Sequence, residues 1–246
     1  MTFRIILQGI NNIIIPFQYH HMMQGLLYSC IENQSKDLAE FLHETGYQYE
    51  KRTFKMFTFS EIIEKPIGVM KKEKQLVYDN EISFYVSTID NQLVNIICKL
   101  MEEQQVVRLG KNRLFIKNIQ ILQYEIEEEM KVRTASPICC YSTGLVNDKK
   151  RTIYYHPYEN EWKNIICENI RKKCETYYGR PKEEFEFSIQ CIDKPIEINI
   201  FYKGIYMKTY KGKFHIKGSK EAIEVAFNAG IGSKNAQGFG LVIPII

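Results

Sequence analysis

The sequence lacks the features that mark membrane, secreted and metal-binding proteins. No apolar run reaches the length that spans a bilayer, and no secretory signal precedes the strand-like pattern of residues 2–7. The seven cysteines are odd in number, form no CxxC pair and mostly lie in apolar runs, which indicates reduced thiols and no zinc site. We therefore expect a cytoplasmic protein that binds no metal or cofactor and contacts no membrane.

Several enzyme classes are also excluded by missing motifs. Gly110 and Lys111 lack the rest of a phosphate-binding Walker loop, and no GxSxG nucleophile motif occurs. No cluster of Asp and Glu suits two-metal phosphoryl transfer, because the acidic run at residues 125–129 is typical of a solvated linker. The adjacent His20 and His21 point apart on a helix, so they form a metal pair only if distant ligands join them.

The chain does contain a repeated order of helices and strands. Its 246 residues, 45% of them hydrophobic, suffice for one large or two small cores, and the net charge of +4 permits a polyanionic partner. Apolar periodicity predicts two successive β-α-β-β-α-β halves, residues 1–123 and 124–246. This order predicts an α+β protein with two tandem ferredoxin-like (RRM-like) domains, whose antiparallel sheets flank a central cleft.

A glycine-rich stretch at residues 228–240, here called the glycine loop, is the most distinctive local motif. Four glycines fall within eleven residues, after the helical run 222–227 and before the apolar strand 241–243. Glycine permits positive φ, and successive exposed N–H groups form a nest for anions such as phosphate. The absence of acids favours a phosphate-contacting loop over a plain tight connection. The predicted contact residues are Gly230, Gly232, Ser233, Lys234, Asn235, Gln237, Gly238 and Gly240.

Basic residues gather in two further segments, a turn at residues 149–151 and the stretch 199–220. The second stretch holds six lysines and no acid, and we expect it to contain a hairpin at 205–217. The interleaved rings are Tyr202, Tyr206, Tyr210 and Phe214. Charge for the backbone and rings for the bases suit single-stranded nucleic acid, whereas the alternative is an ordinary hairpin whose lysines protect an edge. The further predicted RNA-binding residues are Lys149, Lys150, Arg151, Lys203, Lys208 and Lys211.

Three residues of the first half are candidates for proton transfer and charge stabilisation. His43 lies off the apolar face of its predicted helix, and Tyr28 shares a helix side with His20 and Gln24 because the spacing is four. Lys55 is a cation inside the otherwise apolar predicted strand 54–63. A lone histidine is more often a surface residue than a catalyst. A histidine, a tyrosine and a lysine brought together nevertheless match a metal-free ribonuclease.

These motifs together resemble the CRISPR-associated endoribonucleases that cut precursor CRISPR RNA within its repeats, members of the RAMP superfamily. The resemblance covers essentially the whole chain. It rests on the glycine loop before the last strand, on residues 15–17 leading to 24–28, and on residues 41–44 followed by 54–60.

The resemblance implies tandem ferredoxin-like domains and metal-independent cleavage that leaves a 5′-hydroxyl and a 2′,3′-cyclic phosphate. His43 then matches the general acid/base histidine, Tyr28 the first-helix tyrosine and Lys55 the strand lysine. Lys51 and Arg52 compete for the role of Lys55, and the pair His20 and His21 is an alternative to His43.

The expected partner is precursor CRISPR repeat RNA, with other CRISPR effector subunits as further partners and a monomer or homodimer as the expected state. Because some family members bind repeats without cutting, a non-catalytic RNA-binding subunit is the alternative function.

Overall fold

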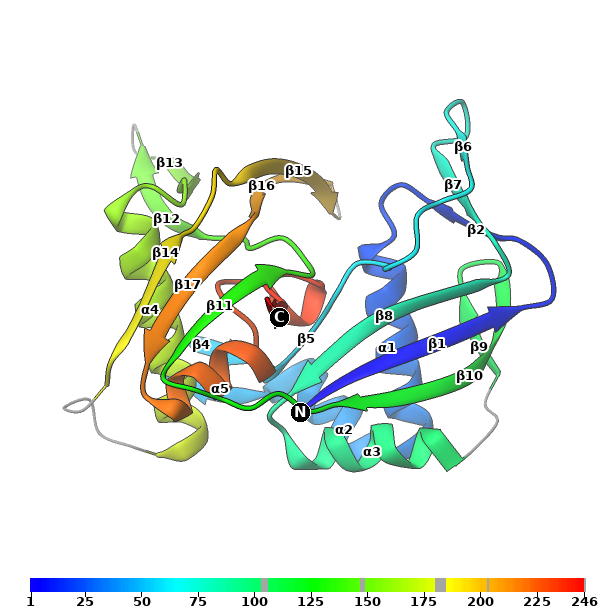
Figure 1. Ribbon diagram of the computed structural model, residues 1–246, viewed down its shortest axis with the longest axis horizontal. Coiled ribbons are helices and arrows are strands. Elements are labelled where there is room, and N and C mark those ends of the chain that lie inside the picture. The colour runs from blue at the N-terminus through cyan, green and yellow to red at the C-terminus, as the bar shows by residue number, and fades with distance from the viewer. Residues whose placement is uncertain (103–105, 147–148, 180–184, 203, 246) are drawn as a thin grey trace.

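Two antiparallel sheets with the same strand order form the frame of the molecule (Figure 1). This computed structural model describes residues 1–102, 106–146, 149–179, 185–202 and 204–245. The first sheet has the order β5-β8-β1-β10-β9. Its strands are β1 (Thr2–Gly9), β5 (Phe57–Phe59), β8 (Glu81–Thr88), β9 (Val106–Leu109) and β10 (Asn112–Leu122). The helices of this half are α1 (His20–Gln34), α2 (Lys36–Glu40) and α3 (Asn91–Glu102), and a π-helical turn, Phe41–Thr45, extends α2.

The second sheet has the order β14-β17-β11-β18. Its strands are β11 (Glu129–Thr134), β14 (Phe187–Cys191), β17 (Lys213–Gly218) and β18 (Val242–Pro244). Helices α4 (Asn160–Tyr178) and α5 (Lys220–Asn228) pack on this sheet. When the edge strand β9 is left out and the other strands are numbered in chain order within each half, both sheets have the order 2-3-1-4. In each half a helix follows the first strand and another follows the third. The predicted α+β fold of two tandem ferredoxin-like units is therefore confirmed.

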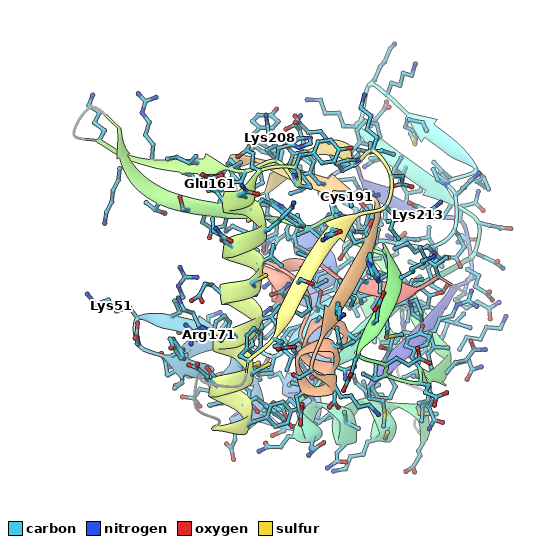
Figure 2. The ribbon with its side chains drawn as sticks, turned by 60° about the vertical axis from the view of Figure 1, so that its left-hand side comes forward. Lys51, Glu161, Arg171, Cys191, Lys208 and Lys213 are labelled. Carbon is cyan, nitrogen blue, oxygen red and sulfur yellow. The ribbon has the colours of Figure 1, made fainter. Side chains whose placement is uncertain are left out.

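Smaller strand pairs are inserted into this frame. In the described part of the chain, one three-stranded sheet and three hairpins lie outside the two main sheets. They are β2 (Ile13–Pro16) with β6 (Gly68–Met70) and β7 (Gln75–Tyr78); β3 (Tyr47–Tyr49) with β4 (Arg52–Phe54); β12 (Tyr141–Val146) with β13 (Lys149–Tyr154); and β15 (Ile196–Tyr202) with β16 (Ile205–Lys211). The hairpins β3–β4 and β12–β13 extend from the side of the frame that carries α4 (Figure 2).

Local sequence signals explain the helix ends. Ser35 accepts a hydrogen bond from the backbone N–H of Leu38, and Asp90 accepts hydrogen bonds from the first turn of α3. Gly46 and Gly179 end their helices at positive φ, where glycine is favoured. Serine and aspartate are favoured at the start of a helix and glycine just after its end, so these helix boundaries follow from the local sequence.

Two predicted strand arrangements are wrong. The predicted strand 54–63 is interrupted because Met56 takes φ +54°, so β4 and β5 belong to different sheets. The predicted hairpin 205–217 does not exist, since β16 pairs with β15 while β17 pairs with β11 and β14. At Gly212 the chain crosses between sheets, held by a hydrogen bond from its N–H to the Thr134 hydroxyl. Alternation predicts strands but does not select their partners.

The glycine loop lies where the two halves meet. The Thr58 hydroxyl of β5 donates to the Phe239 carbonyl at 2.9 Å, and the His20 ring of α1 stacks on the Phe239 ring at 5.2 Å. The backbone N–H of Gly240 donates to the Pro137 carbonyl at 2.9 Å, which attaches the loop to the second half. The loop is thus packed between elements that are far apart in the sequence.

We expect Gly240→Ala to destabilise the protein by about 3 kcal/mol, as measured by urea unfolding. Gly240 has φ +76°, and an added Cβ would lie 1.9 Å from the Ile231 carbonyl oxygen. The matched control is Gly179→Ala, since Gly179 has φ +66° but no atom of the described residues within 4 Å of such a Cβ. This control should lose only the free energy of placing a residue with a Cβ at positive φ, roughly 1 kcal/mol. Equal losses in both variants would contradict the close packing of the loop.

Candidate active site

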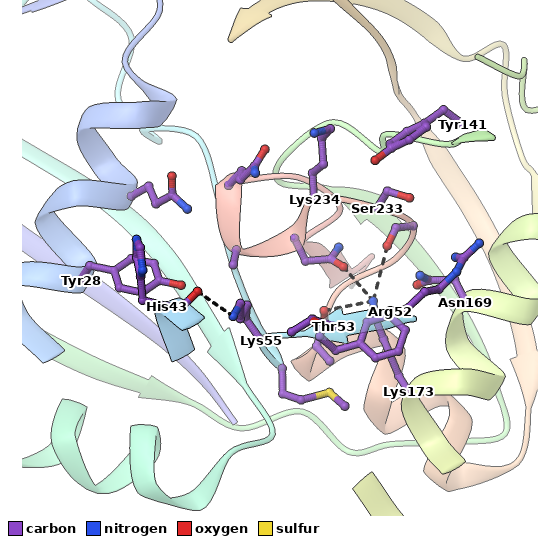
Figure 3. A pocket seen from close by; sticks show the side chains of 18 of the residues that line it. Tyr28, His43, Arg52, Thr53, Lys55, Tyr141, Asn169, Lys173, Ser233 and Lys234 are labelled. Carbon is purple, nitrogen blue, oxygen red and sulfur yellow. Dashed lines mark hydrogen bonds between the residues drawn. The ribbon is translucent and has the colours of Figure 1, made fainter. Parts of the chain in front are cut away.

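A cleft of about 910 Å³ lies between the two halves of the molecule. One wall comes from α1, the π-helical turn and the segment around β4. The facing wall comes from β12, α4 and the glycine loop (Figure 3). The lining includes the three predicted catalytic residues, His43, Tyr28 and Lys55. The two walls come from residues 21–56 and 141–237, which are far apart in the sequence. Local patterns alone could not assign them to one site, so the cleft is a result of tertiary structure.

His43 is exposed on the π-helical turn Phe41–Thr45. Single π turns are frequent at functional sites, because the extra residue re-aims the side chains of the turn. The turn ends at Gly46, whose φ of +59° and ψ of −167° suit glycine alone. A Cβ at Gly46 would lie 2.7 Å from the Phe54 carbonyl oxygen and 3.0 Å from Lys55 Nζ. The missing side chain therefore lets Lys55 approach the turn that carries His43.

Tyr28 reaches the same turn from α1. Its ring meets the His43 ring edge-on at a centroid distance of 6.1 Å, and its hydroxyl donates to the Leu42 carbonyl at 3.4 Å. Burial raises the pKa of Tyr28 to about 12, with a smaller contribution from Tyr202. The phenol therefore holds its proton at neutral pH and acts as a donor.

Lys55 completes this group from the link between β4 and β5. Its ammonium donates to the backbone carbonyl of His43 at 3.1 Å, and burial lowers its pKa. Of the two competing cations, Arg52 also lines the cleft. Lys51 points away from the body of the molecule at the tip of the β3–β4 hairpin (Figure 2).

The alternative histidine pair is divided by the fold. His21 is exposed and lines the cleft, with its ring edge-on to the Tyr202 ring at 6.0 Å. His20 is only 6% exposed and lies between the rings of Tyr19 and Phe239. Burial, followed by the charge of Lys211, lowers the pKa of His20 to about 4. The two neighbours thus have separate roles, one at the cleft and one in the core.

The glycine loop differs from an open anion nest. Among its N–H groups, those of Ile231, Ser233, Gln237, Gly238 and Gly240 already donate to backbone carbonyls. Five of the predicted contact residues line the cleft, namely Gly232, Ser233, Lys234, Asn235 and Gln237. The other three, Gly230, Gly238 and Gly240, are buried and lie outside its lining. The face presented to the cleft is therefore mainly one of side chains, with Lys234 Nζ above the Tyr141 ring at 5.6 Å.

The predicted basic residues outside the loop are spread over several strands. Lys149, Lys150 and Arg151 are exposed on β13. Lys208 forms an ion pair with Glu197 at 3.4 Å, and Lys211 forms one with Glu61. Lys203 lies outside the described residues.

The rings interleaved with these lysines mostly serve the core. Tyr202, Tyr210 and Phe214 are buried, while Tyr206 is 70% exposed. The Tyr202 hydroxyl donates to Gln24 Oε1 at 2.5 Å, which ties β15 to α1. The expectation of a ring-lined RNA hairpin is corrected accordingly, because three of the four rings face inward and the strands belong to different sheets.

Two residues on the facing wall, Asn169 and Lys173, were missed by the sequence reasoning. Both are buried on α4 and line the cleft. They share the buried helix face with Trp162, Ile166 and Ile170. Two polar residues at apolar positions of a helical pattern are the signal that could have found them.

Family models match almost the whole chain. A model described as "CRISPR associated protein Cas6, C-terminal" matches residues 116–243, and one described as "CRISPR-associated protein Cas6, N-terminal" matches residues 14–120. The chain belongs to the Cas6 family. Within the described residues, no group of three or more His, Cys, Asp or Glu could hold a metal ion. No helix in that part of the Cas6 chain has the length and apolar character to cross a membrane.

Relatives and solved structures agree with this assignment. The CRISPR-associated endoribonuclease Cas6 1 of Methanocaldococcus jannaschii is 26% identical over 248 residues, covering 100% of this chain and 93% of the relative. The CRISPR-associated endoribonuclease Cas6 of Pyrococcus furiosus is 27% identical over 234 residues, covering 93% and 83%. A solved CRISPR associated protein Cas6 has a TM-score of 0.80 at 25% identity, covering 100% and 99%. A solved RAMP protein, described as binding different RNA substrates, shares the fold, with a TM-score of 0.83 at 19% identity over 100% of both chains.

The buried state of His20 predicts a loss of stability in acid. Between the ordinary pKa of 6.5 and the lowered pKa of about 4, the unfolded chain binds a proton that the folded protein does not. Stability is therefore lost as the pH falls through this window, by about 2 kcal/mol between pH 7 and pH 5. Urea unfolding at pH 7 and at pH 5 measures this loss of stability in acid. In His20→Gln the loss should be smaller than in the unsubstituted protein by about 2 kcal/mol.

The substitution His21→Gln, at the exposed neighbour, controls for the change of residue itself. An equal acid loss in His20→Gln and in the unsubstituted protein would contradict the buried, neutral state of His20.

Proposed function

We propose that this Cas6-family protein is a metal-independent endoribonuclease that cleaves precursor CRISPR RNA within its repeats. The observation that carries the proposal is the gathering of His43, Tyr28 and Lys55 on one wall of the cleft. The domain of residues 1–123 then supplies the chemistry, and the domain of residues 124–246 supplies most of the facing RNA-binding wall. The names of the relatives from M. jannaschii and P. furiosus, both endoribonucleases, support the same activity.

The reaction needs two proton transfers and stabilisation of negative charge. The ribose O2′ attacks the adjacent phosphorus, so an O2′–P bond forms while the P–O5′ bond breaks. One group takes the proton of the 2′-hydroxyl, and another delivers a proton to O5′. The products are a 2′,3′-cyclic phosphate and a 5′-hydroxyl, and no further reactant is required.

Each of the three residues suits a separate part of this reaction. The imidazole of His43 is the general acid–base group of the three. Tyr28 keeps its proton, because its pKa is raised to about 12, and so donates to an oxygen of the reacting phosphate. The ammonium of Lys55 lies close to the His43 backbone and supplies positive charge for the phosphorane.

The facing wall offers contacts for an RNA strand. On this wall Lys234 supplies positive charge and the Tyr141 ring supplies an aromatic surface, while Arg52 adds positive charge from β4 on the opposite wall. Asn169 is 5% exposed, and its Oδ1 has no hydrogen-bond partner within the described residues. Lys149, Lys150 and Arg151 extend the positive surface beyond the cleft, whereas Lys208 and Lys211 contribute less because each pairs with a glutamate.

We expect His43→Ala to lower cleavage of a repeat RNA by about 100-fold or more, because general acid–base catalysis contributes at least this much. The measurement is single-turnover cleavage in EDTA, with RNA affinity measured in parallel. Affinity should remain largely unchanged, since His43 serves proton transfer rather than binding. An RNA with a 2′-deoxyribose upstream of the scissile phosphate should bind and stay intact.

The matched control is His21→Ala, at the other histidine that lines the cleft. Loss of wild-type activity in EDTA contradicts metal independence, and full activity of His43→Ala contradicts the role of His43. Tight RNA binding by the unsubstituted protein without any cleavage favours the non-catalytic RNA-binding subunit instead.

Gly46→Ala should slow cleavage while RNA affinity is largely retained. The new Cβ would displace Lys55 Nζ and the Phe54 carbonyl from their positions beside the His43 turn. Gly179→Ala again supplies the control, because it places an alanine at positive φ outside the cleft lining. Unfolding measurements on both variants separate lost structure from lost activity, and a fully folded Gly46→Ala with unchanged cleavage would contradict the placement of Lys55.

A further inference from the structure

Lys173 is a fully buried lysine whose ammonium contacts the inner side of the glycine loop (Figure 3). Its Nζ donates to the carbonyl of Gly230 at 2.6 Å, with those of Ala229 and Gly232 at 3.3 Å and 3.5 Å. A further hydrogen bond reaches Asn235 Oδ1 at 2.8 Å. An ammonium has three hydrogens, and four oxygen atoms of one loop share them here.

This charge has no acidic partner among the ion pairs of the described residues. Among the described residues that line the cleft there is no Asp or Glu, and the lining includes the further cations Arg52, Lys55 and Lys234. Burial lowers the pKa of Lys173 to about 7, opposed by the neighbouring Cys174. A buried charge without an acidic partner is unfavourable. A buried lysine such as Lys173 therefore needs other interactions that compensate for its burial.

The glycine loop provides those interactions, because its conformation leaves carbonyl groups pointing inward. Gly230, Gly232, Gly238 and Gly240 all have positive φ, and so does Lys234 at +63°. Buried carbonyl groups without donors are costly. Lys173 supplies donors to the first part of the loop, while the Asn235 amide donates to the carbonyls of Ile231 and Phe239 at 3.2 Å and 3.0 Å.

We infer that Lys173 is a positioning residue for RNA binding, which holds the glycine loop so that Ser233 and Lys234 face the RNA. This inference rests on the proposed RNA-binding function of the cleft. Lys173 acts through the loop and not on the RNA, because its hydrogens are already taken by loop oxygens.

The test compares Lys173→Met with the unsubstituted protein, using a repeat RNA with a 2′-deoxyribose at the cleavage position. Without the hydrogen bonds from Lys173 Nζ, the glycine loop no longer holds Lys234 in place, and RNA affinity should fall about tenfold. The cleavage rate at saturating unmodified RNA should stay close to that of the unsubstituted protein, since the loop supplies no acid or base. Lys172→Met is the matched control, because the adjacent Lys172 pairs with Glu168 at 3.7 Å outside the cleft.

A double-mutant cycle with Lys234→Ala separates positioning from a general structural role. If Lys173 acts through Lys234, the two losses of affinity are not additive, and the double variant binds little worse than either single one. Additive losses, or unchanged affinity in a folded Lys173→Met protein, overturn the inference.

Lys173→Gln provides a second variant that retains N–H donors for the loop carbonyls. It should recover part of the RNA affinity lost in Lys173→Met. A folded Lys173→Gln protein without such recovery would contradict the role of these hydrogen bonds in holding the loop. The non-cleavable RNA keeps the two proposals distinguishable. Tight binding without cleavage of normal RNA overturns only the catalytic proposal, whereas no RNA binding by the unsubstituted protein overturns both.

Discussion

The close packing of the glycine loop between the two sheets is the constraint on which the rest of the site depends. No Cβ fits at Gly240, and Phe239 contacts both His20 of α1 and the hydroxyl of Thr58. The same loop forms part of the facing wall of the cleft. The packing that joins the two halves therefore also sets the distance between the group around His43 and the basic side chains opposite it.

Buried polar groups have two different origins in this molecule. His20 lies in an apolar stack where burial favours its neutral form. Lys173 lies among carbonyl oxygens that stabilise its charge, although burial lowers its pKa. The difference follows from the surroundings, since aromatic faces offer histidine no acceptor whereas an inward-facing glycine loop offers lysine several.

Local patterns were sufficient for many features of the chain. The caps at Ser35 and Asp90 and the helix stops at Gly46 and Gly179 act over one turn of chain, so they can be recognised directly. Patterns whose structural outcome depends on a distant pairing strand or packing neighbour were less informative. Strand alternation around residue 212 indicates two strands but not that they belong to separate sheets, and the interleaved tyrosines turned inward.

The sequence by itself determined the order of the two βαββαβ units, the presence of the glycine loop and the residue types suited to RNA cleavage. Only the tertiary structure decided that His43, Tyr28 and Lys55 share one wall, that His20 is buried while His21 faces the cleft, and that Lys173 supports the loop. The physical reason is the separation along the chain over which each interaction acts. Propensities and caps act between neighbours in the chain, whereas burial, pKa shifts and hydrogen-bond partners are set by residues that meet only after both sheets have packed.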